Sequence, residues 1–264
     1  MPTLSYKIQG RFANNLIQYC IAKLLCKLFG HTFTSKKERD VIVLTDFDWN
    51  LIAPTFIENL GNPKFFRKHP YAKKNLRLEG FFQQSDYLLP FRQTILSFFT
   101  PTNTDVIHET YTVAQLTQRI QSYPRFQEIV VHLRLDDFRA AGKDHTSVIL
   151  HPDYFHKFLP ALIETQGLPI RIVYERKKHI AEEAYIQTFV RYTPIFQNSE
   201  LLNDFATLVN AKVLVSSNST FSWMAGFLAN DQIRILPTIC HMGTQKLGAI
   251  DSTDIVKESF FIEL

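Results

Sequence analysis

Residues 131–138 (VHLRLDDF) place a histidine, an arginine and two aspartates directly after an apolar run. The run, residues 129–131, predicts a buried strand, and charged groups at its end need partners because desolvating a charge is costly. Open α/β sheets bind ligands at the carboxyl ends of their strands. The planar fork of Arg134 matches two oxygens of a phosphate, so the segment predicts an anion site. The alternative interpretation is a strand edge whose polar residues face water.

A second cluster of polar side chains also follows an apolar run. Residues 213–215 (VLV) precede the segment SSNS at 216–219 and then an apolar helical repeat, a pattern typical of strand, turn and helix. Small hydroxyl residues at a helix start are ordinary N-caps. At a helix N-terminus, free backbone N–H groups and the positive end of the helix dipole also form an anion site. The turn therefore predicts a second phosphate-directed element, with simple helix capping as the alternative.

Four segments of the chain resemble motifs of bacterial α-1,2-fucosyltransferases, and they occur in the order found in that family. Residues 217–225 (SNSTFSWMA) resemble S-N-S-(S/T)-F-S-W-W-A, and residues 131–138 resemble V-H-I-R-R-G-D-Y. Residues 10–19 (GRFANNLIQY) resemble G-R-L-G-N-Q-M-F-Q-Y, and residues 79–85 (EGFFQQS) are a looser match to G-Y-F-Q-S. The matches are spread over most of the chain, which makes the resemblance specific.

The resemblance extends to the superfamily of α-1,2-, α-1,6- and protein O-fucosyltransferases. It implies an α/β, glycosyltransferase-B-like fold with two Rossmann-like domains facing a cleft. It also implies an inverting glycosyltransferase that moves L-fucose from GDP-fucose to a hydroxyl of a glycan acceptor, without a metal. Two alternatives stay open: a transferase that uses another GDP-sugar, and a non-catalytic relative that binds a sugar or a nucleotide.

The resemblance also assigns roles at the donor site. By analogy with the family, His132 contacts guanine or ribose, Arg134 contacts the diphosphate, and Asp204 matches an acidic residue that recognises guanine in the α-1,6 branch. The same resemblance implies that Ser219, Thr220 and the backbone of Phe221 bind the β-phosphate. The other expected donor-binding residues lie in the same turn and in the first domain: Ser217, Asn218, Gly10, Arg11 and Asn14.

Catalysis in such an enzyme depends on the departing GDP. Stabilising the negative charge that builds on the β-phosphate lowers the barrier, which makes Arg134 a candidate catalytic residue. Inversion also calls for a general base, or for leaving-group stabilisation alone. Asp137, Asp144 and His145 are the candidate bases, and Asp137 is taken here with Arg134 as the catalytic pair.

Three positions depart from the family's motifs. Leu135 stands where the family has a second arginine, Asp136 replaces a glycine, and Ala13 replaces a glycine of the first motif. Leu135 removes a guanidinium group, and Asp136 adds negative charge near the expected diphosphate. The departures are the reason for keeping the non-catalytic alternative.

A metal site has little support in the sequence. Asp46 and Asp48 form a D-x-D, which holds Mn²⁺ and a nucleotide diphosphate in another glycosyltransferase architecture, but two aspartates at this spacing also occur by chance. The histidines are scattered without ligand-type spacing. We therefore expect no metal and no cofactor. The chain has no G-x-G-x-x-G and no P-loop, so hydride and phosphoryl transfer have no positive support.

The elements that must position these residues follow from hydrophobic periodicity. Expected strands are residues 41–44, 128–133, 170–174, 212–216 and 233–236, and expected helices are residues 14–29, 153–165, 178–190, 200–209 and 220–229. Asn14 is the expected cap of the first helix and Gly30 its end. Residues 60–76 are expected to form an exposed connection.

Strand–helix alternation in the second half predicts a parallel sheet with helices on both faces. We therefore expect an N-terminal acceptor-side domain over residues 1–124. A C-terminal, Rossmann-like domain over residues 125–264 would bind the nucleotide sugar.

Composition limits the partners and the compartment. A net charge of +4 fits an anionic substrate or the surface of a membrane, at which the protein would be peripheral, and does not establish a nucleic-acid binder. The expected partners are a nucleotide sugar and a glycan acceptor. Cys20, Cys26 and Cys240 have no zinc-type spacing and are expected to be buried free thiols. With no signal-peptide core and no long apolar run, the expected location is the cytoplasm.

Overall fold

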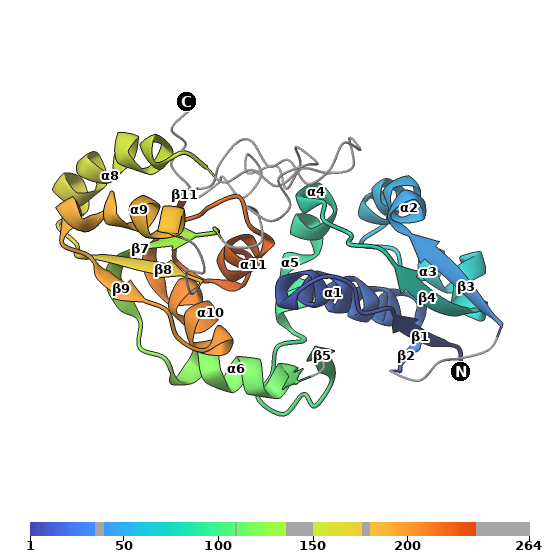
Figure 1. Ribbon diagram of the computed structural model, residues 1–264. Coiled ribbons are helices and arrows are strands. Elements are labelled where there is room, and N and C mark those ends of the chain that lie inside the picture. The colour runs from blue at the N-terminus through green and yellow to red at the C-terminus, as the bar shows by residue number, and fades with distance from the viewer. Residues whose placement is uncertain (35–39, 109, 136–149, 176–179, 236–264) are drawn as a thin grey trace. The chain divides into compact units, whose positions relative to one another are not determined.

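The computed structural model describes residues 1–34, 40–108, 110–135, 150–175 and 180–235 (Figure 1). The chain folds into two compact units, the first spanning Met1–Thr117 and the second beginning at Gln118. The expected boundary, after residue 124, lies further along the chain. Each unit contains its own parallel sheet with helices, which confirms the predicted α/β class with two Rossmann-like domains.

The first unit is built on a four-stranded sheet with the order β2-β1-β4-β3, in which all neighbours are parallel. Its strands are β1 (Thr3–Tyr6), β2 (Thr32–Phe33), β3 (Val41–Thr45) and β4 (Asn75–Glu79). The chain leaves β1 for β2 on one side and later places β4 and β3 on the other. The strand order therefore reverses between β1 and β4, the kind of switch point at which open sheets bind ligands.

Helix α1 (Phe12–Phe29) follows β1 and is almost completely buried. It begins after Arg11, whose extended backbone makes it the N-cap; the expected cap, Asn14, is wrong because Asn14 already lies within the first turn. Gly30 ends the helix as predicted. Its φ of +77° is the left-handed conformation that glycine adopts readily, and its N–H donates to Cys26 O at 2.8 Å.

The remaining elements of the first unit are short. They are the helices α2 (Asp46–Glu58), α3 (Pro63–Lys68), α4 (Ser85–Leu88) and α5 (Arg92–Leu96), the turns η1 (Pro70–Lys73) and η2 (Leu89–Phe91), and the hairpin β5 (Val106–His108) and β6 (Tyr111–Thr112). The expected exposed connection at 60–76 is wrong in part, because it contains α3 and η1. Phe66 of α3 is buried and packs edge-on against Phe29 and Phe56, and this contact holds the segment on the core.

The second unit has a five-stranded parallel sheet with the order β11-β10-β7-β8-β9. Its strands are β7 (Phe126–Leu133), β8 (Ile170–Tyr174), β9 (Ile195–Gln197), β10 (Ala211–Val215) and β11 (Ile233–Ile235). Its helices are α6 (Val113–Ser122), which joins the two units, and α8 (Pro152–Gln166), α9 (Ile180–Gln187), α10 (Leu201–Val209) and α11 (Thr220–Leu228), with the turn η3 (Val190–Tyr192). The order reverses between β7 and β10, which is the switch point of this sheet.

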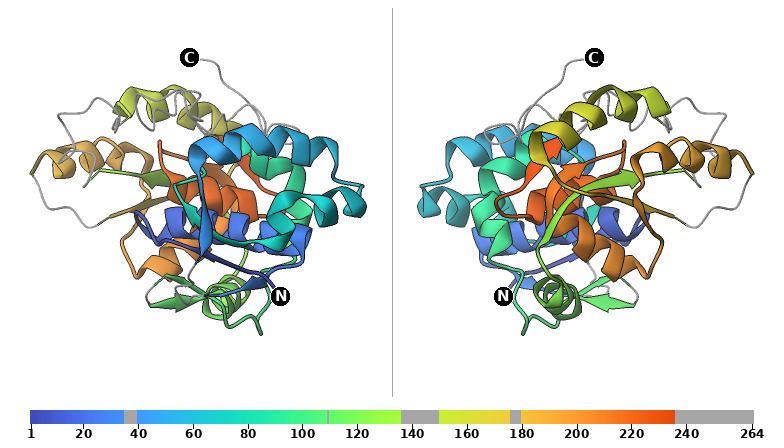
Figure 2. Two further views of the ribbon diagram at one scale, coloured as in Figure 1. Left: turned by 90° about the vertical axis from the view of Figure 1, so that its right-hand side faces the viewer. Right: turned by 90° about the vertical axis from the view of Figure 1, so that its left-hand side faces the viewer.

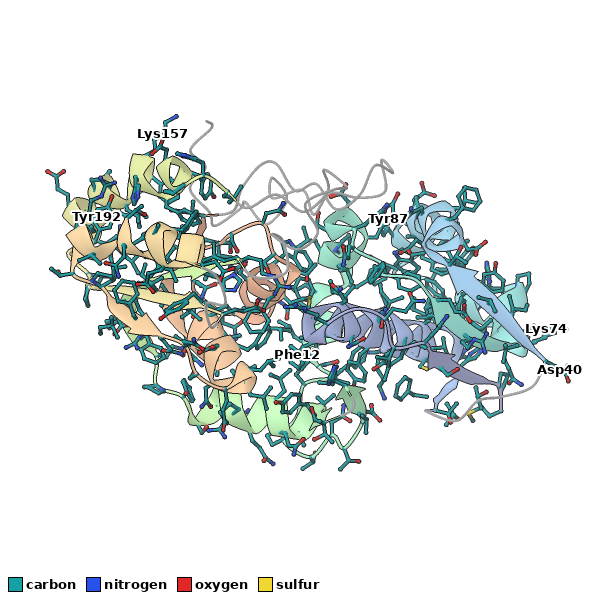
Figure 3. The ribbon with its side chains drawn as sticks, viewed as in Figure 1. Phe12, Asp40, Lys74, Tyr87, Lys157 and Tyr192 are labelled. Atoms are coloured by element: carbon teal, nitrogen blue, oxygen red, sulfur yellow. The ribbon has the colours of Figure 1, made fainter. Side chains whose placement is uncertain are left out.

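Side chains along β7 alternate between the two faces of the sheet. One face packs into a single apolar core against α8 and α9: Ile129, Val131, Leu133, Leu135, Phe155, Phe158, Ile186 and Phe189. Lys157, on the outer side of α8, extends away from that core (Figure 3). His132 is out of phase with the core residues and lies on the opposite face, where its ring centre is 5.5 Å from that of Phe221 in α11. Helices α10 and α11 cover that face of the sheet (Figures 1 and 2).

The elements expected in the second unit match the structure closely, whereas β9 and α6 were not expected. The helix expected at 178–190 is shorter, because α9 ends at Gln187 and the turn η3 follows it. Among the described cysteines, Cys20 and Cys26 are buried free thiols, as predicted, and Cys240 lies outside the described residues. Of the described helices, none is both long and apolar enough to cross a membrane.

Candidate functional site

The two polar motifs of the second unit meet at its switch point. His132 lies near the end of β7, and Ser217 follows β10, the neighbouring strand. The Ser217 hydroxyl and His132 Nδ1 are 2.9 Å apart, and the two residues are only 5% and 3% exposed. A buried hydrogen bond therefore joins the motif at 131–138 to the turn at 216–219.

The imidazole of His132 is neutral in this setting. Burial, together with the nearby charge of Arg134, lowers its pKa to about 3. A neutral imidazole has one donor nitrogen and one acceptor nitrogen, so the ring can exchange a hydrogen bond with Ser217 and keep the other nitrogen for a second group. Such a ring suits an uncharged group such as a nucleobase or a ribose hydroxyl.

The turn after β10 caps helix α11. Ser219 is the N-cap, and its hydroxyl accepts the Phe221 N–H at 3.2 Å. The side chains of Ser217, Asn218 and Ser219 are almost fully buried, while Thr220 is partly exposed at the first helical position. The capping interpretation of the sequence is thus correct for Ser219. Capping leaves the positive end of the helix dipole in place, so it does not exclude an anion.

Phe221 connects this turn to the neighbouring helix. Its ring centre lies 5.5 Å from that of His132 and 5.1 Å from that of Phe205 in α10. The N–H of Phe221 already bonds to Ser219, so a phosphate at this position would compete with the cap. The aromatic contacts fix the relative positions of β7, α10 and the start of α11.

Arg134 lies at the end of β7 beside the end of β8. Its Nη1 donates to Glu175 Oε1 at 3.0 Å, and the two side chains are 12% and 33% exposed. The guanidinium therefore stands at the carboxyl edge of the sheet, where the prediction required it, with a carboxylate next to it that the sequence interpretation did not consider. The candidate bases Asp137, Asp144 and His145 lie outside the described residues, as does Asp136.

Asp204 lies in the first turn of α10, at the same edge of the sheet, and is 9% exposed. Its Oδ1 accepts Gln197 Nε2 at 2.8 Å, and both its oxygens lie 3.3 Å from the Ser199 N–H. The Ser199 hydroxyl donates to the same carboxylate. The local loop therefore fixes the position of Asp204, a restraint that the sequence interpretation missed.

In the first unit, the structure joins the other two motifs. Gln83 Nε2 donates to Asn14 Oδ1 at 2.8 Å, and Gln18 Nε2 donates to the Gly80 carbonyl at 2.7 Å. Residues 10–19 and 79–85 thus lie together at the carboxyl ends of β1 and β4. Gly10 has a φ of +74°, and a Cβ there would lie 2.2 Å from Asn14 Nδ2, so the turn requires glycine. Arg11 is exposed beside it.

The D-x-D aspartates are both engaged with backbone groups. Asp46 accepts the N–H groups of Phe81 and Phe82, and this contact holds Phe82 at a φ of +54°. Asp48 accepts the N–H of Thr45 at 2.8 Å in a capping box at the start of α2. Within the described part of the chain, no three His, Cys, Asp or Glu side chains gather as a metal site would need. These hydrogen bonds give both carboxylates a structural role.

Several residues at these edges had no signal in the sequence. Gln197 is the last residue of β9, and Glu175 and Ser199 come just after β8 and β9, so their only sequence cue is a polar residue at a strand end. Gln83 lies within a matched segment, but its bond to Asn14 depends on which strands are neighbours. Strand order, which a single sequence does not state, decides these contacts.

Comparison with known proteins gives structural neighbours of low similarity. No family model matches the chain, and no curated protein matches it. POFUT1 in complex with GDP-fucose aligns at 10% identity over 99% of this chain and 97% of its own, with a TM-score of 0.47. The E. coli heptosyltransferase WaaC with ADP-2-deoxy-2-fluoro heptose aligns at 11% identity over 100% and 93%, with a TM-score of 0.47. With ADP, WaaC aligns at 13% identity over 95% and 92%, with a TM-score of 0.44. At these values the similarity assigns no activity to this chain.

Proposed function

We propose that this protein is a glycosyltransferase whose second unit binds a nucleoside-diphosphate sugar at the switch point of its sheet. The observation that carries the proposal is the buried His132–Ser217 hydrogen bond. It brings together, at the position where open sheets bind ligands, two segments that separately resemble the donor site of α-1,2-fucosyltransferases. Chance matches in unrelated parts of a chain would have no reason to meet at one edge.

The donor we propose is GDP-fucose, with a glycan hydroxyl as the acceptor and an α-1,2 linkage. Neutral His132 would contact guanine or ribose, and Asp204 would accept the guanine N–H groups. The diphosphate would lie between Arg134 and the start of α11, with Ser217, Asn218, Ser219 and Thr220 around it.

The chemistry would be an inverting displacement. The acceptor oxygen attacks the anomeric carbon, the bond from that carbon to the β-phosphate oxygen breaks, and GDP leaves with the bonding electrons. The acceptor proton passes to a base, for which Asp137 is the candidate. The guanidinium of Arg134 and the dipole of α11 stabilise the charge that builds on GDP, so no metal is required.

The proposal is tested by thermal shift with a panel of nucleotides: GDP, ADP, UDP, CMP and dTDP. A ligand present at 100 times its Kd stabilises the fold by about 2.7 kcal/mol, so selective GDP binding raises Tm well above the effect of the others. Equal shifts with UDP and GDP would contradict the proposed donor. A largest shift with ADP would point instead to an ADP-sugar. Release of GDP from GDP-fucose with a supplied glycan acceptor then distinguishes a transferase from a non-catalytic relative.

A further inference from the structure

A chain of hydrogen bonds crosses the second unit from β7 to α10 and ends at Asp204. Arg171 of β8 donates from Nε and Nη2 to the two oxygens of Glu128 in β7, at 2.6 and 3.0 Å. Its Nη1 donates to Gln197 Oε1 in β9 at 3.1 Å. Gln197 Nε2 then donates to Asp204 Oδ1 at 2.8 Å. Three neighbouring strands and one helix thus share one continuous polar network.

Donor and acceptor chemistry fixes the direction of every bond in this chain. An arginine side chain can only donate and an ionised carboxylate can only accept. The amide of Gln197 lies between them, so its oxygen must face Arg171 and its nitrogen must face Asp204. Thr207 agrees with this orientation, since its hydroxyl donates to the Asn203 carbonyl at 2.9 Å and can accept from Gln197 Nε2, which lies 2.9 Å away.

Two contacts restrain Arg171, and they make the hydrogen-bond network rigid. The pair with Glu128 is bidentate, and the two side chains are only 16% and 13% exposed. The ring of Phe126 lies below the guanidinium, 5.0 Å from its central carbon. A bidentate pair and a stacked ring restrict both the position and the plane of the group, so Gln197 receives a fixed partner.

We infer that Gln197, oriented by Arg171, is a positioning residue that sets how well Asp204 discriminates guanine from other bases. The inference rests on the proposed function, because it takes Asp204 as the group that meets the base. The donors from Gln197 and Ser199 converge mainly on Oδ1; among the described residues, the contact of Oδ2 is the Ser199 N–H at 3.3 Å. With Oδ1 held by these donors, Oδ2 is the oxygen that we take to meet the base.

Guanine recognition by a carboxylate has a specific signature. The ring N–H and the exocyclic amine of guanine both donate, whereas hypoxanthine lacks the exocyclic amine. A correctly aimed carboxylate therefore prefers GDP over inosine diphosphate, by about tenfold for a good bidentate pair. A carboxylate in the wrong orientation reduces this preference for GDP without changing the contacts to the diphosphate.

The experiment measures Kd by calorimetry for GDP, inosine diphosphate, ADP and pyrophosphate, using the whole chain and the variant Gln197→Met. Methionine keeps the length of the side chain and removes the amide. We expect GDP affinity to fall about threefold to tenfold, the range of one lost hydrogen bond, and the preference over inosine diphosphate to disappear. Pyrophosphate affinity should not change. Gln187→Met is the matched control, because Gln187 makes an equivalent bond to Glu183 at 2.7 Å on an exposed helix surface.

Three further variants make the result decisive. Asp204→Asn should abolish the preference, and adding Gln197→Met to it should cost nothing more, because both act through one carboxylate. If Gln197→Met does not fold, Gln197→Glu replaces it: this isostere keeps the Arg171 partner and places a second carboxylate against Asp204. Full GDP preference in the Gln197 variant, with loss in Asp204→Asn, overturns the inference and leaves the proposed function standing. A wild-type protein that binds ADP as well as GDP overturns the inference together with the proposed GDP-sugar donor.

Discussion

His132 shows how one buried side chain links stability to the proposed site. Its pKa of about 3 lies below the ordinary value near 6.5, so the unfolded chain binds a proton more readily than the folded chain. The stability from the neutral ring is complete above the unfolded pKa and is lost as the pH falls from there toward 3. Between pH 7.5 and pH 5 the loss is on the order of 2 kcal/mol.

The prediction is that His132→Gln unfolds with a weaker dependence on pH over this range than the wild-type protein. Urea unfolding at pH 5, 6 and 7.5 measures it. His151→Gln is the control, because the side chain of His151 is 77% exposed and its loss removes no buried ring. Parallel pH profiles for wild type and His132→Gln would contradict the buried neutral state.

Arg134 carries the catalytic prediction. If its guanidinium stabilises the departing diphosphate, Arg134→Ala lowers kcat by about 10²–10³ while the fold is retained. Arg134→Lys rescues poorly, because a point charge does not reproduce the planar fork. The measurement is kcat with GDP-fucose and Tm for each variant.

Leu135→Ala, at the adjacent position, is the matched control for these variants. Leu135 is 2% exposed and packs in the apolar core, so its loss costs about 2–5 kcal/mol of stability and leaves GDP affinity near that of wild type. Near-normal turnover in Arg134→Ala would remove the assigned phosphate role. If Arg134→Ala unfolds instead, the pair with Glu175 is structural.

At the scale of elements, the second unit could be predicted well from the sequence. β7, β8, β10 and α11 combine buried apolar runs with polar turns, and both signals are local. The first unit was harder, because β1 (TLSY) and β4 (NLRLE) have no continuous apolar run. Asn14 is a good N-cap by type, but the helix starts earlier, at the turn that Gly10 makes possible.

The candidate site could also be predicted only in part from the sequence. The residues at strand ends were predictable one by one, whereas the His132–Ser217 contact required the order of β7 and β10. The network from Glu128 to Asp204 spans four elements without a local pattern, and nothing in the sequence indicates it. Contacts between elements depend on topology, and hydrophobic periodicity does not record topology.

The turn between β1 and α1 gives an element-scale prediction. Gly10→Ala forces a side chain into a left-handed backbone and against Asn14, which costs about 1–3 kcal/mol of stability. Chemical unfolding measures the loss. Gly61→Ala is the matched control, since a Cβ there meets nothing within 4 Å and its φ is not in the left-handed range. Equal stability of the two variants would show that the turn relaxes without strain.

For the molecule as a whole, we propose that transfer is independent of metal. The positive charge would come from Arg134 and the start of α11, and Asp46 and Asp48 are bonded to backbone N–H groups. We expect activity with GDP-fucose and a glycan acceptor to be the same in EDTA as in buffer. Loss of activity in EDTA that Mn²⁺ restores would require a metal site and a different use of the D-x-D.

A crystal structure of the protein with GDP is the sharpest test of the proposed donor site. We expect the β-phosphate within hydrogen-bonding distance of Arg134 and of the first turn of α11, with guanine between His132 and Asp204. We also expect the His132–Ser217 bond to be kept. GDP bound away from the carboxyl ends of β7 and β10, or no bound GDP at saturating concentration, would contradict the proposed site.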